Sequence, residues 1–406
     1  MNITKRTNKY DLFLLLLTGS LGFGELGGAF QLSRILALML FPVIVSHYRS
    51  CLYYTKPVIV FFILFYTYSL SSMLWTPDIE EGVKELVYYP IHFLLLIEIL
   101  ICSKFAVNTL KSLSTGWLLS VMFCAVVAVW ELTTGNHLGI DTTAEHAFYA
   151  GGLNRFTASA TFGNYNGYVT FLCFSVPWLF YILLDDRVLV SKLTTLAVLI
   201  TSSLIIIIDA SRGGLLSLGI MIMVYFVFSK KNSGKTLIFL LLIVGFVYGV
   251  YKYGSDITTI IEARSSDGAM FSDDSRMLIW SNALNAFADT WGLGVGIGGL
   301  KKGIEPYAHG EIAITHNMFL EMLVQYGIII TLVFMFYLVN TFIKALKTER
   351  NIKIVLMMAF VAMPVYMIIN SGYLLSPWLY VLIATIIVFT DYERIKSANK
   401  ILRKTT

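Results

Sequence analysis

The feature that most constrains this chain is a series of long apolar runs. A run of about 20 apolar residues spans the hydrocarbon core of a bilayer as a helix, in which every backbone polar group is satisfied internally. Twelve such runs can be read from the sequence, at 11–29, 33–48, 57–75, 86–102, 116–134, 167–184, 191–209, 211–229, 236–253, 316–343, 352–370 and 374–390. They predict an all-α polytopic membrane protein with about twelve transmembrane helices.

Composition excludes a soluble alternative of the same length. Of the 406 residues, 57% are hydrophobic and only 14% are charged, whereas a soluble domain carries about 25% charged residues. Too few polar side chains remain to coat a soluble surface of this size. We expect residues 1–406 to form a single transmembrane domain.

The distribution of positive charge predicts the orientation. With the N-terminus placed in the cytoplasm, 21 of the 30 lysine and arginine residues fall in cytoplasmic segments, each of which holds at least two. Positive residues are retained on the cytoplasmic side of membrane proteins, so both termini are predicted to be cytoplasmic. The first run follows Lys5, Arg6 and Lys9 and lacks a clear A-x-A cleavage site after it, so we expect it to be retained.

Two outer loops are unusually long. They cover residues 135–166 and 254–315, which is 32 and 62 residues, and the second lies between the ninth and tenth runs. Loops beyond about 15 residues are commonly functional when they are not disordered. Both carry aromatic residues, so we expect ordered structure that caps the outer face.

The second loop contains an amphipathic pattern near residues 275–291. Its apolar residues are spaced by three and four, at Met277, Trp280, Leu284, Phe287 and Trp291, which is typical of one face of a helix. The helix could be a purely structural lid. Alternatively, Arg276 in its first turn could bind an anion, since a helix N-terminus offers free N–H groups and a positive dipole.

Further arginines lie at or near the outer boundary of the membrane. Arg212 and Arg34 each follow a serine at the start of an apolar run, whereas Arg155 and Arg264 lie in the long loops. An arginine near the end of a span must find a partner or extend to the interface. Each therefore has a structural alternative: an ion pair with Asp209 for Arg212, interfacial placement for Arg34, and solvation for the loop arginines.

His316 is the most suggestive single residue. It stands with Asn317 where the long loop re-enters the membrane. A helix N-terminus disfavours the imidazolium form, so His316 should be neutral and able to accept a proton near pH 7. An ordinary interfacial histidine would also fit this position.

The glycine-rich stretch 294–299 formally matches G-x-G-x-x-G. A dinucleotide site requires that pattern between a strand and a helix of a βαβ unit, and this stretch instead follows an amphipathic helix outside the membrane. We interpret it as a tight turn that lets backbone approach backbone or ligand. No metal-ligand pattern appears, and no cofactor is expected.

Two classes of function fit these features. Arginines and a neutral histidine beside lipid suit an enzyme that acts on an anionic, lipid-linked substrate at the outer surface. A twelve-span transporter would show two similar halves joined by a central cytoplasmic linker, but only about six residues join the sixth and seventh runs. The enzyme is favoured, and nothing indicates nucleic-acid binding.

Six segments in order resemble the bacterial O-antigen ligase and O-antigen polymerase superfamily. They are Ser71–Asp78, Asn154–Asn166, Ser211–Gly214, Ser275–Arg276 with Ile279–Trp280, Gly292–Gly298, and His316–Glu321 with Gly327. The resemblance covers about residues 60–330. It implies a metal-independent, inverting glycosyltransferase of the helical GT-C type in the bacterial inner membrane, with a periplasmic active site.

The resemblance also implies substrates, partners and residue roles. Such enzymes move a glycan from undecaprenyl diphosphate to an acceptor hydroxyl, with Arg212 and Arg276 on the donor diphosphate. His316 would act as the general base or as a diphosphate ligand. The further candidates for substrate binding are Arg155, Arg264, Asn317 and Arg34. Membrane lipid and a chain-length regulator protein are the other expected partners.

The acceptor distinguishes two forms of this reaction. A polymerase uses a lipid-linked repeat unit, and a ligase uses lipid A–core. Ligases similar to this chain follow the His-Asn pair, after nine residues, with Gly-x-x and then Gly, Thr or Tyr. Here Gly327 is present, but Ile330 occupies the last position. This departure favours a polymerase of O-antigen, capsule or exopolysaccharide and leaves the ligase open.

Overall fold

The computed structural model describes residues 7–140, 157–184, 189–209, 211–229, 273–308 and 314–395. Within these ranges the regular elements are helices and no strand occurs. The chain divides into two compact units. Unit one comprises residues 1–32, 108–269 and 345–369, and unit two comprises residues 33–107, 270–344 and 370–406.

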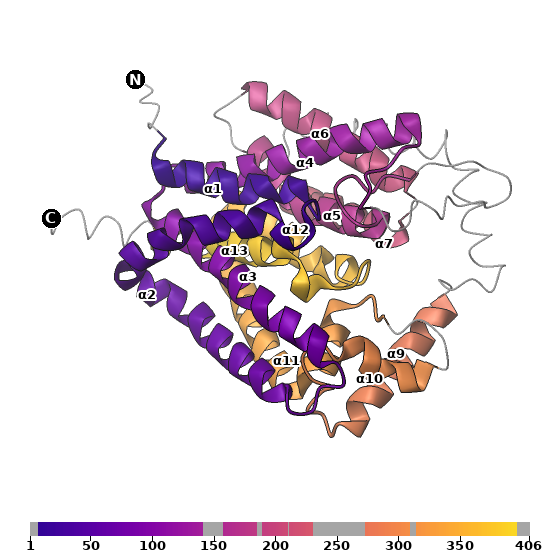
Figure 1. Cartoon of the computed structure of the whole chain (residues 1–406). Helices are drawn as coiled ribbons and strands as arrows, with labels where there is room; N and C mark the ends of the chain where they lie inside the picture. Colours follow the sequence, from indigo (N-terminus) through magenta and orange to yellow (C-terminus); the bar gives the residue numbers. More distant parts are fainter. Residues whose placement is uncertain are drawn as a thin grey trace. The chain divides into compact units, whose positions relative to one another are not determined.

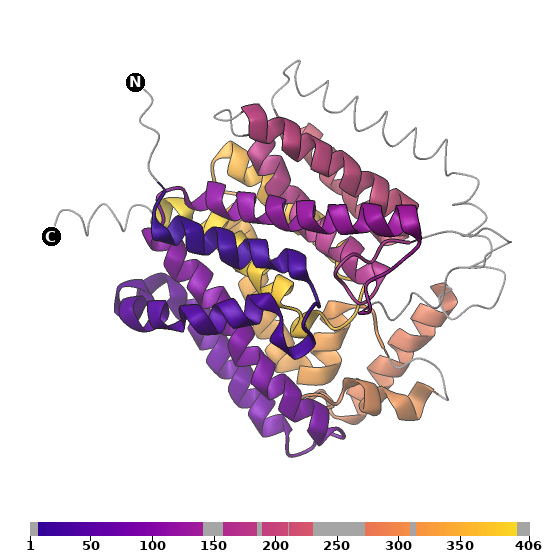
Figure 2. The same ribbon diagram turned by 45° about the horizontal axis from the view of Figure 1, so that its top comes forward.

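Unit one is a bundle of apolar helices (Figure 1). Its α-helices are α1 (Lys9–Gly19), α4 (Thr109–Thr134), α5 (Tyr165–Leu184), α6 (Leu189–Ile208), α7 (Arg212–Phe228) and α12 (Arg350–Tyr366), with two short 3-10 helices, η1 (Ser20–Phe23) and η2 (Gly28–Phe30). Helix α1 lies along α4 in Figures 1 and 2. A Cβ atom added to Gly116 would lie 1.6 Å from the Thr18 hydroxyl oxygen, so this close packing depends on glycine.

Unit two contains the remaining described elements. They are α2 (Leu32–Ser72), α3 (Ile79–Phe105), α9 (Asp273–Asp289), α10 (Leu300–Ala308), α11 (Met318–Ala345), η4 (Tyr373–Leu375) and α13 (Pro377–Thr390). An aromatic cluster joins three of the helices: the Phe65 ring of α2 lies 5.0 Å from the Tyr89 ring of α3 and 4.8 Å from the Tyr326 ring of α11, centroid to centroid. Burying such rings against one another supplies large apolar contact areas.

Among the helices of the described residues, four are long and apolar enough to cross a membrane: α3, α4, α5 and α11. Shorter apolar helical segments cover Leu32–His47, Lys192–Ile208, Arg212–Phe228 and Pro377–Thr390. The predicted all-helical, multi-pass class is therefore confirmed. The number of twelve spans and the side on which each loop lies stay predictions, and the run at 236–253 lies outside the described residues.

Helix α2 differs from its prediction. The sequence predicted two spans separated by a short loop, whereas the structure has one helix of 41 residues that contains Pro42 and Pro57. A straight helix of that length would measure about 60 Å, roughly twice the hydrocarbon thickness of a bilayer. Figures 1 and 2 show two arms that meet in a sharp bend, and a proline inside a helix favours bending because it removes a backbone hydrogen bond.

Helix α9 occupies the amphipathic stretch, but it buries a different face. Its buried apolar residues are Ile279, Ala283 and Ala286, whereas Met277, Leu284 and Trp291 of the predicted stripe are 64%, 47% and 94% exposed. Trp280 and Phe287 are partly buried against the core of α9, α10 and α11. Small alanines let a helix approach its neighbours closely, and Met277, Leu284 and Trp291 remain outside that contact.

Candidate functional site

His316 lies in the segment that leads into α11, within unit two. The residue has a positive φ of 46°, a conformation that costs free energy for any residue other than glycine and persists where the surrounding structure enforces it. Asn317 follows as the cap of α11, because its side-chain oxygen accepts hydrogen bonds from the backbone N–H groups of Phe319 (3.1 Å) and Leu320 (3.2 Å). The strained turn and the cap together fix the imidazole at the start of the helix.

Helix α9 is held against this segment by an apolar core and one hydrogen bond. Ala283 and Ala286 of α9 share a buried cluster with Leu320 and Val324 of α11. The indole Nε1 of Trp280 donates to the backbone oxygen of Thr315 at 2.8 Å. Trp280 thus anchors α9 to the residue that precedes His316.

Arg276, one turn before Trp280, influences His316 electrostatically. Burial lowers the pKa of the His316 imidazole and the positive charge of Arg276 lowers it further, to about 4. The imidazole is therefore neutral at pH 7, and its Nδ1 atom is buried without a hydrogen-bond partner. A guanidinium beside a neutral imidazole can bind an anion and also exchange a proton with a nearby hydroxyl.

The glycine-rich turn between α9 and α10 makes backbone hydrogen bonds to α11. The Val295 N–H donates to the Val324 oxygen at 2.8 Å, and the Gly296 N–H donates to the Gln325 oxygen at 3.0 Å. A Cβ atom on Gly294 would lie 2.6 Å from the Gly327 nitrogen. The interpretation of this stretch as a close backbone approach is confirmed, and its partner is the protein itself.

Glu85, a buried carboxylate that contacts this turn, was not predicted from the sequence. One oxygen of Glu85 accepts hydrogen bonds from the hydroxyls of Tyr89 (2.8 Å) and Tyr326 (2.9 Å), from the Gly298 N–H (3.1 Å) and from the Gln325 side-chain amide. The sequence feature that could have revealed Glu85 is a glutamate near the start of an apolar run. A carboxylate within a membrane segment requires hydrogen-bonding partners. Through its hydrogen bond with Gly298, Glu85 holds the glycine-rich turn against α3.

Arg212 belongs to unit one, where it is the first residue of α7. Its side chain is exposed, and the preceding Ser211 caps the helix by accepting from the Gly214 N–H at 3.3 Å. A Cβ atom on Gly214 would lie 2.5 Å from the side chain of Val169 on α5. The start of α7 is thus packed tightly while Arg212 points away from the protein interior.

The other candidates have different surroundings. Arg34, only 7% exposed, donates from Nε to His92 Nε2 at 3.1 Å and from Nη2 to the Leu375 oxygen at 3.3 Å. Its guanidinium also lies 4.1 Å from the centroid of the Tyr88 ring, so it is bound within the helix bundle. Arg155 and Arg264 lie outside the described residues.

Arg276, His316, Asn317 and Arg34 all belong to unit two. Arg276 and His316 interact electrostatically, while Arg34 has its own partners. The approach of Arg212 to this pair stays a prediction. Among the described histidine, cysteine, aspartate and glutamate side chains, no group of three is arranged to hold a metal ion.

The fold and these contacts define a multi-pass helical membrane protein in which an arginine, Arg276, acts on a histidine, His316, at the start of α11. The family model described as O-antigen ligase matches residues 197–335, a range that includes Arg212, Arg276 and His316. The chain is also 24% identical over 294 residues to the teichuronic acid biosynthesis protein TuaE of Bacillus subtilis, across 68% of this chain and 58% of that protein. The chain thus spans a little over half the length of this relative.

Together the two matches confirm the resemblance to the O-antigen ligase and polymerase superfamily. At that level of detail the chain is similar to proteins described as an O-antigen ligase and as a teichuronic acid biosynthesis protein.

Proposed function

We propose that this protein is a glycosyltransferase that extends a surface polysaccharide by transferring a growing glycan from undecaprenyl diphosphate to a lipid-linked repeat unit. The observation that supports it most directly is the neutral imidazole of His316 beside Arg276 at the start of α11. This pair combines the two chemical abilities that such a transfer requires: stabilising a departing diphosphate and accepting a hydroxyl proton.

In the reaction, an acceptor hydroxyl attacks the anomeric carbon of the donor on the side opposite the diphosphate. The new glycosidic bond forms as the carbon–oxygen bond to the diphosphate breaks, so the anomeric configuration inverts. Arg276 and Arg212 stabilise the negative charge that develops on the diphosphate, since guanidinium groups bind phosphate oxygens in a bidentate manner. No metal ion takes part.

His316 receives the proton of the acceptor hydroxyl. In the free protein its pKa of about 4 makes it a weak base. A bound diphosphate brings negative charge to Arg276, which offsets the effect of that arginine and raises the affinity of the imidazole for a proton. Donor binding thereby activates the base.

The polymerase assignment is supported by Ile330, which departs from the pattern of the ligases, and by a relative named for teichuronic acid biosynthesis. A ligase that transfers the glycan to lipid A–core is the second candidate, because the matching family model is described as O-antigen ligase. In both cases the active site faces the periplasm, and a chain-length regulator is a further partner of the polymerase.

Deletion of the gene in its native host separates these reactions. Extracted lipopolysaccharide or polysaccharide is compared on a gel with that of the complemented strain. For a polymerase we expect lipid A–core that carries a single repeat unit, or only short glycan where the host lacks lipid A. Bare core with long glycan on the undecaprenyl carrier would indicate the ligase instead.

Complementation with variants tests the site in the same strain. Arg212→Ala, Arg276→Ala and His316→Ala should each remove most of the long glycan at normal protein levels, while the exposed Lys301→Ala control retains it. Arg34→Ala should have a smaller effect than the first three. A glycan profile unchanged by gene deletion would reject both the polymerase and the ligase and favour a transporter.

A further inference from the structure

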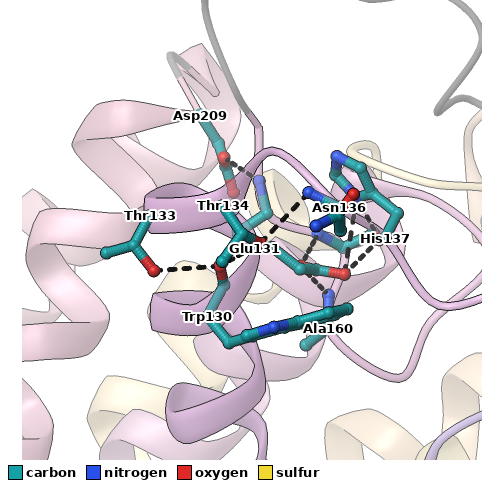
Figure 3. Close-up of polar contacts among 10 residues, drawn as sticks. Trp130, Glu131, Thr133, Thr134, Asn136, His137, Ala160 and Asp209 are labelled. Carbon is teal, nitrogen blue, oxygen red and sulfur yellow. Dashed lines mark hydrogen bonds and ion pairs between the residues drawn. The ribbon is translucent and has the colours of Figure 1, made fainter.

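Three acidic side chains from separate elements of unit one bind the backbone of a single loop. We call residues 157–164 the clamped loop; it runs directly into α5. The Ala158 N–H donates to Asp209 at 2.8 Å, and the N–H groups of Ser159 and Ala160 donate to Glu131 Oε2 at 2.9 and 2.7 Å. The Gly163 N–H donates to Glu25 at 3.1 Å. Figure 3 shows Glu131 and Asp209 directed at this backbone.

Glu131 is the central contact of the clamped loop. Its side chain is fully buried at the end of α4, and its Oε1 atom accepts a further hydrogen bond from the Ser159 hydroxyl at 3.2 Å. Withdrawing a carboxylate from water costs several kcal/mol unless strong donors replace the water. Apart from the His137 ring nitrogen, which lies 3.4 Å from Oε1, the donors described here come from one loop, so the carboxylate and the loop conformation stabilise each other.

The backbone conformation of the clamped loop depends on this support. Ala160 has a positive φ of 50°, which is unfavourable for a residue with a Cβ atom and persists only where surrounding contacts enforce it. Two carboxylate bonds, to Ser159 and Ala160, hold the backbone at that position. Removing the carboxylate would allow Ala160 to relax.

The two ends of the clamped loop are linked to residues at or just before the start of α7. At one end Asp209, which binds Ala158, lies three residues before Arg212. At the other end α5 continues from the loop, and its Val169 packs against Gly214 so closely that an added Cβ atom would lie 2.5 Å away. A shift of the clamped loop would therefore move the start of α7 and with it Arg212.

The same residues do not form a nucleophilic triad. The Ser159 hydroxyl and Glu131 both face the same ring nitrogen of His137, Nδ1, at 3.5 and 3.4 Å. A triad requires the serine and the carboxylate on opposite nitrogens of the imidazole. Ser159 is also only 1% exposed, so no substrate reaches it.

We propose that Glu131 is a positioning residue that fixes the clamped loop against the start of α7 and so presents Arg212 to the diphosphate of the lipid-linked donor. This inference rests on the proposed function, in which Arg212 binds that diphosphate. Glu131 itself touches no substrate. It acts through the backbone of Ser159 and Ala160.

The test uses the full-length protein in nanodiscs, with undecaprenyl diphosphate as the probe. Glu131→Gln keeps the shape of the side chain but places an amide NH₂ among the donors of the loop. Glu98→Gln is the matched control, since Glu98 is also a fully buried glutamate of a long apolar helix and its carboxylate has no hydrogen-bond partner. Hydrogen exchange of the clamped loop and affinity for the probe are both measured.

In Glu131→Gln, the Ser159 and Ala160 amides should exchange about tenfold faster, because each loses a hydrogen bond to a charged acceptor. The dissociation constant for the probe should rise about ten- to a hundredfold, the effect of misplacing a binding group by about 1 Å. Glu131→Asp should recover part of the affinity, and Glu98→Gln should alter neither quantity.

A double variant tests whether the effect passes through Arg212. Arg212→Ala should weaken probe binding by itself, and adding Glu131→Gln should weaken it no further, because residues that act as one unit are not additive. A full additional loss in the double variant would overturn the inference. So would normal affinity in a folded Glu131→Gln protein.

Two further outcomes are distinguishable from these. If Glu131→Gln does not accumulate, Asp209→Asn probes the clamped loop from its other carboxylate, with the same expected changes and the same double variant. If the wild-type protein does not bind undecaprenyl diphosphate, the donor in the proposed function is wrong, and the positioning role falls with it. Faster exchange in Glu131→Gln would then establish a structural clamp alone.

Discussion

At the scale of single residues, the positive charge of Arg276 acts on the buried imidazole of His316. The His316 pKa is about 4, against an ordinary value of 6.5, because of burial first and of Arg276 second. The sequence predicted a neutral imidazole on the basis of helix position. The structure gives two stronger causes, both of which require residues distant in sequence to meet.

We predict that Arg276→Ala raises the pKa of His316 towards 6.5 without reaching it, because burial remains. An NMR titration of the imidazole resonance, assigned with His316→Gln, measures this shift. Lys301→Ala, which removes an exposed lysine of α10, serves as the control and should leave the resonance unchanged. An unaltered His316 pKa in Arg276→Ala would show that the two side chains are not coupled.

The same group predicts how stability depends on pH. Above about pH 6.5 the imidazole is neutral in the folded and unfolded chains alike, so its contribution to the free energy of unfolding does not vary with pH. Between 6.5 and 4 the unfolded chain binds a proton that the folded chain does not, and the free energy of unfolding falls as the pH falls through this window. Thermal melting of the wild type should show this decrease in stability between pH 6.5 and 4. In His316→Gln the decrease over the same pH range should be smaller.

At the scale of elements, the glycine turn shows how one short segment fixes several helices. Gly298 has a φ of +69°, and an added Cβ atom would lie 2.2 Å from the Gly82 nitrogen of α3. Its N–H also donates to Glu85. The turn therefore joins α3 to the segment between α9 and α10, and it supports the start of α11 through the contacts to Val324 and Gln325.

We predict that Gly298→Ala lowers the melting temperature by several degrees. The positive φ alone costs about 1–2 kcal/mol for a residue with a Cβ atom, and the collision with α3 adds to that cost. Gly372→Ala is the matched control, because Gly372 has the same φ of +69° but no atom within 4 Å of an added Cβ. Equal losses in the two variants, measured in detergent, would contradict a role for backbone packing at Gly298.

At the scale of the whole molecule, the charge distribution predicts which loops lie on each side of the membrane. Lys301 and Lys347 are both exposed lysines of described segments, but the predicted topology places them on opposite sides. Cysteine at position 301 should react with a membrane-impermeant maleimide in intact cells. Cysteine at position 347 should react only after permeabilisation. The reverse pattern would invert the orientation, and labelling of both in intact cells would reject the predicted span count.

The sequence determined the class of molecule and the chemistry of its candidate residues. Apolar runs fixed the helical, membrane-spanning character because a bilayer permits few other solutions, and ordered motifs led to Arg212, Arg276 and His316. These signals are local. Each depends on residue type and on spacing along one segment, so they can be read without knowing what packs against what.

The pairing of polar groups and the choice of the buried face of a helix depend on contacts between segments of the folded chain. Glu85 stands just before one apolar run and Glu131 within another, and neither run shows that Glu85 binds Gly298 or that Glu131 binds Ser159. These partners lie 213 and 28 residues away along the chain, separations that a pattern along one segment cannot report. The face of α9 was set by the close approach of Ala283 and Ala286, and not by its largest apolar side chains. The physical reason is the same in each case: hydrogen bonds and packing are satisfied between segments, so their partners exist only once the chain has folded.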